Sequence, residues 1–133
     1  MFSIDYKVGV KDINYGGHMG NEIPLQLFQQ CRVDFFLSHD LSELNIGENV
    51  GVIQKNSYVS YNKEVFLGDL LKISITNIEL TKISFNVFYT IFRGEELVVE
   101  GSTLLVAFNY EKGKPTKIPE SFKSLCSELF RNI

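Results

Sequence analysis

The chain has 133 residues, a length typical of one domain that buries a core without disulfides or metal. Its 13 basic and 16 acidic residues give a formal charge of −3, without the concentrated positive charge that nucleic-acid binding requires, so we expect no DNA or RNA partner. No apolar run approaches the roughly 18 residues of a membrane span, and the first residues lack the basic-then-apolar order of a signal peptide. We therefore expect one domain, residues 1–133, in the cytoplasm and not in a membrane.

The first predicted element is a short strand over 2–10, and it ends in a polar, glycine-rich stretch. This stretch runs from Asp12 to Glu22 and reads DINYGGHMGNE. Glycines allow close approach of a ligand to the backbone, and a helix start offers unpaired N–H groups to a developing negative charge. The pattern is typical of a site for chemistry at a carbonyl.

A helix is predicted over 22–38, directly after this stretch. Asn21 is a candidate cap, and Pro24 falls within the first turn, where its missing N–H costs nothing. Apolar residues follow at helical spacing: Leu27, Phe28, Cys31 and Phe35. Further apolar positions widen this surface, so the helix is expected to be central and covered on more than one side.

Strands are predicted over 51–64, 71–76, 84–93 and 96–109, where apolar residues alternate with polar ones. Their short connections predict antiparallel neighbours in a meander. The segment from Pro119 predicts an amphipathic helix, whose apolar face would hold Phe122, Leu125, Cys126, Leu129, Phe130 and Ile133. The order of elements indicates an α+β fold, in which an apolar helix covers one face of an antiparallel sheet.

The two cysteines, Cys31 and Cys126, both lie within helical apolar patterns. Neither belongs to a CxxC motif or to a Cys/His cluster, so the sequence predicts reduced thiols in the core. A disulfide, a zinc site and a nucleophilic cysteine are the disfavoured alternatives. Arg32, within the same apolar helix, is expected to make a structural ion pair.

These motifs, taken in order, resemble the hotdog-fold acyl-CoA thioesterases, in the branch similar to 4-hydroxybenzoyl-CoA thioesterase. In that family a first strand leads into an Asp-x-Asp-x-x-Gly-His-Val-like loop and then a central helix that often carries an Ala-Arg pair. The stretch 61–69 also looks like the family's Tyr…Gly-Asp approach to the next strand. The matching residues here are Asp12, Asn14, Gly17, His18 and Met19, with Cys31-Arg32 at the helix pair.

The resemblance implies a curved antiparallel sheet wrapped around a long central helix, followed by a C-terminal helix. It also implies homodimers or homotetramers with active sites in clefts between protomers. Its substrates would be thioesters of coenzyme A or of an acyl-carrier protein, hydrolysed with neither metal nor redox cofactor.

One departure from the family pattern concerns the catalytic carboxylate. Many members carry it at the second acidic position of the loop, where this chain has Asn14. An amide has essentially no proton affinity near neutral pH, so Asn14 cannot act as a general base. The nearest replacement is Glu22, whose charged form the helix start favours, and we predict that Glu22 activates water or attacks the thioester.

The remaining site residues are predicted to position the substrate. Asn14 and His18 would orient water or substrate, while backbone N–H groups around Gly20 and Asn21 would hold the carbonyl oxygen as it gains charge. The residues assigned to substrate binding are Asp12, Gly17, Gly20, Asn21 and Tyr61, of which Asp12 is expected mainly to brace the loop.

Each assignment has a structural alternative. Glu22 can owe its place solely to its favourable interaction with the helix dipole, without any catalytic role. Asn14 and Asp12 are common turn formers, His18 can simply bind the loop backbone, and Asn21 can be no more than a cap. A non-catalytic hotdog protein that binds acyl thioesters as a sensor or carrier is therefore the alternative function.

Overall fold

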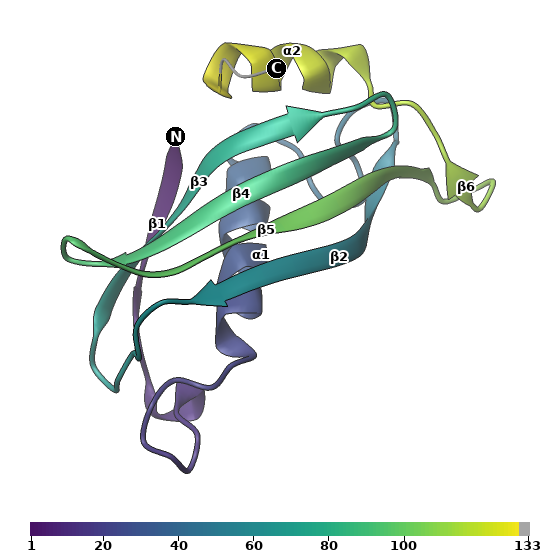
Figure 1. The fold of residues 1–133 in the computed structure, drawn as a ribbon. Helices are drawn as coiled ribbons and strands as arrows, with labels where there is room; N and C mark the ends of the chain where they lie inside the picture. The colour runs from purple at the N-terminus through teal and green to yellow at the C-terminus, as the bar shows by residue number, and fades with distance from the viewer. Residues whose placement is uncertain (131–133) are drawn as a thin grey trace.

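The computed structural model describes residues 1–130, and it has an α+β fold with two α-helices and a six-stranded sheet (Figure 1). The predicted helix over 22–38 is confirmed to within one residue at each end. The elements in chain order are β1 (Phe2–Lys7), a 3-10 helix (Val10–Asp12), α1 (Ile23–Leu37), β2 (Gly51–Tyr61), β3 (Leu70–Leu80), β4 (Ser84–Arg93), β5 (Glu96–Asn109), β6 (Lys114–Pro115) and α2 (Glu120–Phe130). Ile133, which the predicted C-terminal helix includes, lies outside the described residues.

The strands pair in the order β1-β3-β4-β5-β2, with β6 on β5, and every pair is antiparallel. The predicted antiparallel sheet is confirmed, but the meander is wrong at one place, because β2 pairs with β5 and not with β3. The connection 62–69 instead passes from one edge of the sheet to its interior. Strands β2 and β3 are three strand spacings apart, which is about 14 Å, and the eight residues of the connection reach about 26 Å when extended. A short connection therefore does not require that the two strands be neighbours.

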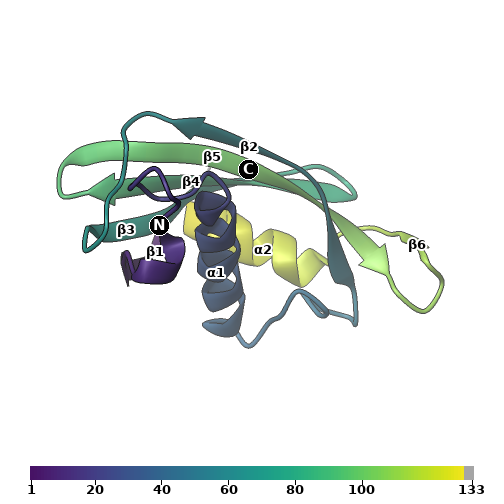
Figure 2. The same ribbon diagram turned by 90° about the horizontal axis from the view of Figure 1, so that it is seen from below.

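Both helices lie on the same side of the curved sheet, as Figure 2 shows. Helix α1 is the longer one, and its buried residues include Phe28, Phe35 and Phe36. The ring of Phe28 stacks on Tyr89 of β4, with ring centroids 4.3 Å apart. Phe122 of α2 lies 4.9 Å from Phe85 of β4, so α2 closes the end of the same core.

The ends of two elements differ from the prediction. Strand β1 ends at Lys7, because the next backbone N–H, that of Val8, donates to Asp69 O at 3.0 Å and the chain then turns into the 3-10 helix. Asn21 is not the cap of α1. Glu22 occupies that position with helical backbone angles and no side-chain capping bond.

Arg32 and the two cysteines are buried, as the sequence predicts. Arg32 Nε binds Glu43 Oε2 at 2.5 Å, and its Nη1 donates to Tyr89 Oη at 3.0 Å. Burial raises the pKa of the Cys31 and Cys126 thiols to about 12, so both remain protonated near neutral pH. Neither α1 nor α2 is long and apolar enough to cross a membrane.

Candidate active site

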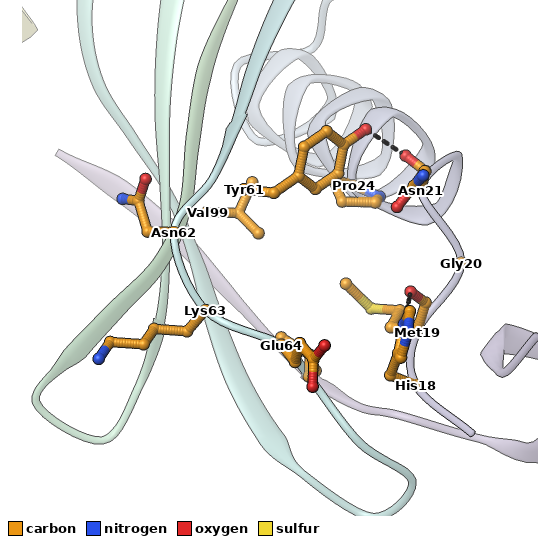
Figure 3. Close-up of a pocket in the computed structure, with 11 residues that line it drawn as sticks. His18, Met19, Gly20, Asn21, Pro24, Tyr61, Asn62, Lys63, Glu64 and Val99 are labelled. Atoms are coloured by element: carbon orange, nitrogen blue, oxygen red, sulfur yellow. Dashed lines mark hydrogen bonds between the residues drawn. The ribbon is translucent and has the colours of Figure 1, made fainter. Parts of the chain in front are cut away.

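A cavity of about 270 Å³ lies where the glycine-rich loop, the start of α1 and the end of β2 meet (Figure 3). One wall comes from the loop and the first turn of α1. The opposite wall comes from the last residue of β2 and the segment that follows it. The lining residues are His18, Met19, Gly20, Asn21, Pro24, Tyr61, Asn62, Lys63, Glu64, Val65 and Val99.

The tip of the loop is shaped by Asn14 and does not reach the cavity. Asn14 Oδ1 accepts the N–H of Gly16 at 2.8 Å, and the Asn14 backbone N–H donates to His18 O at 3.0 Å. Gly17 has a φ of +86°, which favours glycine, and its N–H donates to Asn14 O at 3.1 Å. Asn14 and Gly17 therefore form a turn at the surface, and neither lines the cavity.

Asp12 lies beneath the loop, with only 4% of its surface exposed. Its carboxylate accepts the Tyr6 O–H at 2.5 Å and the Gly9 N–H at 2.9 Å, while its backbone oxygen accepts the Gly20 N–H at 2.9 Å. The hydrogen bond to Asp12 raises the pKa of Tyr6 to about 12. Asp12 thus joins β1 to the residues that line the cavity without lining it itself.

Four predicted site residues do line the cavity: His18, Gly20, Asn21 and Tyr61. Tyr61 Oη donates to Asn21 O at 2.5 Å, so the two walls are joined there. His18 Nδ1 lies 3.4 Å from Met19 O, within reach of a hydrogen bond to that carbonyl. The Gly20 N–H is already bonded to Asp12, whereas the Asn21 N–H has no acceptor among residues 1–130.

Glu22, the predicted catalytic carboxylate, is an exposed residue that does not line the cavity. Its side chain lies over Gly20, and a Cβ placed on that glycine would be 2.5 Å from Glu22 Oε1. Its carboxylate forms no hydrogen bond to the helix start that it caps. The structure therefore places Glu22 beside Gly20 on the loop wall but outside the cavity lining.

The opposite wall holds a carboxylate that the sequence prediction missed, that of Glu64. In Figure 3 its carboxylate points toward His18, while the side chains of Asn62 and Lys63 point away from the loop. A signal for it exists, because Glu64 is the only acidic residue between Tyr61 and Gly68 in the stretch that carries the family resemblance. The helix start, which favours a charged carboxylate, points to Glu22 instead.

The cavity thus has a histidine and a carboxylate on facing walls, with a free backbone N–H from Asn21 at the start of α1. These are the parts that can orient a water molecule and stabilise a carbonyl oxygen that gains negative charge. Within residues 1–130, no three His, Cys, Asp or Glu side chains are grouped so that they would hold a metal ion.

The fold is similar to solved structures along nearly its whole length. A 1,4-dihydroxy-2-naphthoyl-CoA thioesterase from Synechocystis matches with a TM-score of 0.85 and 20% identity, covering 96% of this chain and 96% of that one. A Staphylococcus aureus protein in complex with CoA matches with a TM-score of 0.88 and 21% identity, covering 98% and 84%. A probable thioesterase from Bartonella henselae matches with a TM-score of 0.78 and 21% identity, covering 90% and 100%. The curved sheet around α1 is thus the hotdog fold.

Comparison at the level of sequence gives the family. No curated protein matches the chain. The family model described as "Thioesterase-like superfamily" matches residues 8–125, which include both walls of the cavity. The chain therefore belongs to the thioesterase-like superfamily.

Proposed function

We propose that this protein hydrolyses an acyl thioester of coenzyme A or of an acyl-carrier protein to the free acid and the thiol. The observation that carries the proposal is the cavity in which His18 and the Asn21 N–H lie opposite the end of β2, in a chain of the thioesterase-like superfamily. Hydrolysis needs a polarised carbonyl, an activated water and partial exclusion of solvent, and the cavity offers groups for each.

The thioester carbonyl would be polarised at the start of α1. The Asn21 N–H has no acceptor in residues 1–130, and the Tyr61 hydroxyl holds the carbonyl of the same residue. A donor held in this way stabilises charge on a substrate oxygen, and loss of one such donor typically lowers kcat about 100- to 1000-fold. His18, which lines the cavity and whose Nδ1 contacts Met19 O, would orient the water or the substrate.

The substrate class is supported by the similar proteins. The Staphylococcus aureus structure contains CoA, and the Synechocystis protein acts on an aromatic acyl-CoA. An acyl-CoA is therefore the first substrate to test. Lys63, which lines the cavity but points away from the loop in Figure 3, is a candidate contact for a phosphate at its mouth.

We also propose a homodimer that pairs through β2. This strand forms an edge of the sheet, and residues 53–58 on it are exposed. Exposed apolar side chains on an open edge favour pairing with another strand, and here they include Ile53, Tyr58 and Tyr61. Since Tyr61 also lines the cavity, a partner at this edge would cover part of the site. Light scattering coupled to size exclusion measures the mass directly.

The test is a panel of acyl-CoA substrates assayed by release of free thiol. Wild type is compared with Glu22→Ala, the sequence-derived candidate, and with Asn14→Asp, which restores the family's usual carboxylate. A chelator such as EDTA is expected to leave the rate unchanged, since we propose a reaction without metal. Tight binding of acyl-CoA without thiol release would favour the alternative of a sensor or carrier.

A further inference from the structure

We infer that Glu64, in place of the Glu22 that the sequence predicts, is the carboxylate that activates the attacking water. This inference rests on the proposed thioester hydrolysis and names the base for it. It depends on the position of Glu64, on how its backbone is held, and on the contrast with Glu22.

The position of Glu64 is the first step. Glu64 lines the cavity, and in Figure 3 its carboxylate points toward the loop wall that carries His18. Within residues 1–130 this carboxylate makes no hydrogen bond and no salt bridge, so both oxygens are available to a water molecule or substrate. It is also the only carboxylate among the residues that line the cavity.

The backbone around Glu64 is held from both sides, although it lies in a loop. The next residue, Val65, accepts the Met19 N–H on its carbonyl oxygen at 2.7 Å, which joins this segment to the loop wall. The carbonyl oxygen of Glu64 itself accepts a hydrogen bond from Arg93 Nη1 at 2.9 Å. A base fixed relative to the carbonyl-binding group needs no reorganisation during the reaction.

Arg93 is itself fixed, so the clamp on the Glu64 backbone is rigid. Its guanidinium binds Asp69 Oδ2 at 2.9 Å and Glu96 Oε1 at 3.1 Å. Asp69 Oδ2 also accepts the Phe66 N–H at 2.9 Å, which closes the turn that follows Glu64. Asp69 and Glu96 both pair with the Arg93 guanidinium, which also binds the Glu64 carbonyl oxygen. Within residues 1–130 the Glu64 carboxylate itself has no ion-pair partner.

Glu22 lacks the first of these properties, a place in the cavity lining. Its carboxylate lies over Gly20, and Glu22 is absent from the cavity lining. Its place at the start of α1 is explained without catalysis, because an acid there interacts favourably with the helix dipole.

The step balances as a general-base hydrolysis. Glu64 takes a proton from water while the water oxygen forms a bond to the thioester carbon, and the carbonyl oxygen takes the electron pair. When the tetrahedral intermediate collapses, the carbon–sulfur bond breaks and the proton on Glu64 passes to the leaving thiolate. The products are the free acid and the thiol, with Glu64 again ionised.

The experiment compares Glu64→Gln with Glu22→Gln, both nearly isosteric, and with Glu111→Gln, an exposed control in the turn after β5. On the best acyl-CoA of the panel, Glu64→Gln is expected to lower kcat by about 100-fold or more, the range of a lost general base. Glu22→Gln and Glu111→Gln are expected to stay within about threefold of wild type, as for residues outside the reaction. The dissociation constant of coenzyme A and the melting temperature are expected to be unchanged in Glu64→Gln.

Three results would overturn the inference. If wild type releases thiol and Glu64→Gln retains its kcat, Glu64 is not the base, and the proposed function stands without it. If the loss of activity in Glu64→Gln is matched by an equal loss of coenzyme A affinity, Glu64 serves binding and not catalysis. If wild type hydrolyses no thioester of the panel, the proposed function and the inference fail together.

Discussion

The part-buried hydrogen bond between Tyr6 and Asp12 is expected to stabilise both the fold and the loop wall of the cavity. The Asp12 carboxylate accepts two hydrogen bonds, from the Tyr6 O–H at 2.5 Å and from the Gly9 N–H at 2.9 Å. A hydrogen bond to a charged group contributes about 1.5–3 kcal/mol, and Asp12→Ala removes two of them. Asp12→Ala is therefore expected to lower the free energy of unfolding by about 3–5 kcal/mol.

Tyr6→Phe removes one of these two hydrogen bonds, so its expected cost is smaller, about 1–2 kcal/mol. The double variant separates the contact from the other effects of each substitution. If the bond stabilises the protein as we argue, Asp12→Ala and Tyr6→Phe together will cost about 1–2 kcal/mol less than the sum of the single variants. Urea unfolding followed by circular dichroism measures all four free energies.

The same bond makes a pH prediction with a definite sign. Tyr6 has its pKa raised from the ordinary 10 to about 12, chiefly by the hydrogen bond to Asp12, so the folded state holds the phenol proton more tightly than the unfolded state does. This contribution to stability is fully present below pH 10 and is lost as the pH rises from 10 to about 12. Between pH 9 and 11, wild type should therefore lose more stability than Tyr6→Phe. Equal losses in the two proteins, or additive free energies in the double variant, would refute the reasoning.

Two further substitutions test the core that supports the site. Glu43→Ala leaves the buried Arg32 guanidinium with Tyr89 alone, so we expect the free energy of unfolding, measured in urea, to fall by about 2–4 kcal/mol. Glu43→Gln keeps an acceptor oxygen and should lose less stability. Gly101→Ala would place a Cβ 2.7 Å from Phe28 Cε2 and in collision with the Tyr58 carbonyl oxygen. We therefore expect the free energy of unfolding to fall by about 1–3 kcal/mol, or the protein not to fold. A melting temperature like that of wild type would contradict the packing described.

The elements of the fold follow from local patterns, which is why most of them could be predicted. The apolar residues of α1 recur at helical spacing and Pro24 lies in its first turn, while β4 alternates buried and half-buried residues along its length. The two-residue strand β6 was not predicted, because a pair of residues carries no periodicity. The position of β2 could not be predicted either, since it depends on which strand the chain pairs with after the connection 62–69 and not on any local pattern.

The candidate site was predictable mainly on the loop wall, and Tyr61 is the one residue of the opposite wall that the sequence also predicted. The loop from Asp12 to Asn21 is continuous in sequence, so its residue types and spacing identify it, and His18, Gly20 and Asn21 do line the cavity. The predicted roles within the loop could not be separated from sequence, because Asn and Asp serve turns as readily as sites. Here Asn14 closes a turn and Asp12 is buried against Tyr6, and both arrangements depend on contacts that residue type alone does not specify.

The second wall arises from the topology. Glu64 follows β2, about forty residues after the loop in sequence, and it reaches the loop because the connection between β2 and β3 passes beside it. The hydrogen bond from Met19 to Val65, at 2.7 Å, is made by backbone atoms and so leaves no trace in residue type. Position along the chain therefore favours Glu22, while the carboxylate among the residues that line the cavity is that of Glu64. Comparing Glu64→Gln with Glu22→Gln thus also asks whether proximity along the chain or across the fold identifies the base.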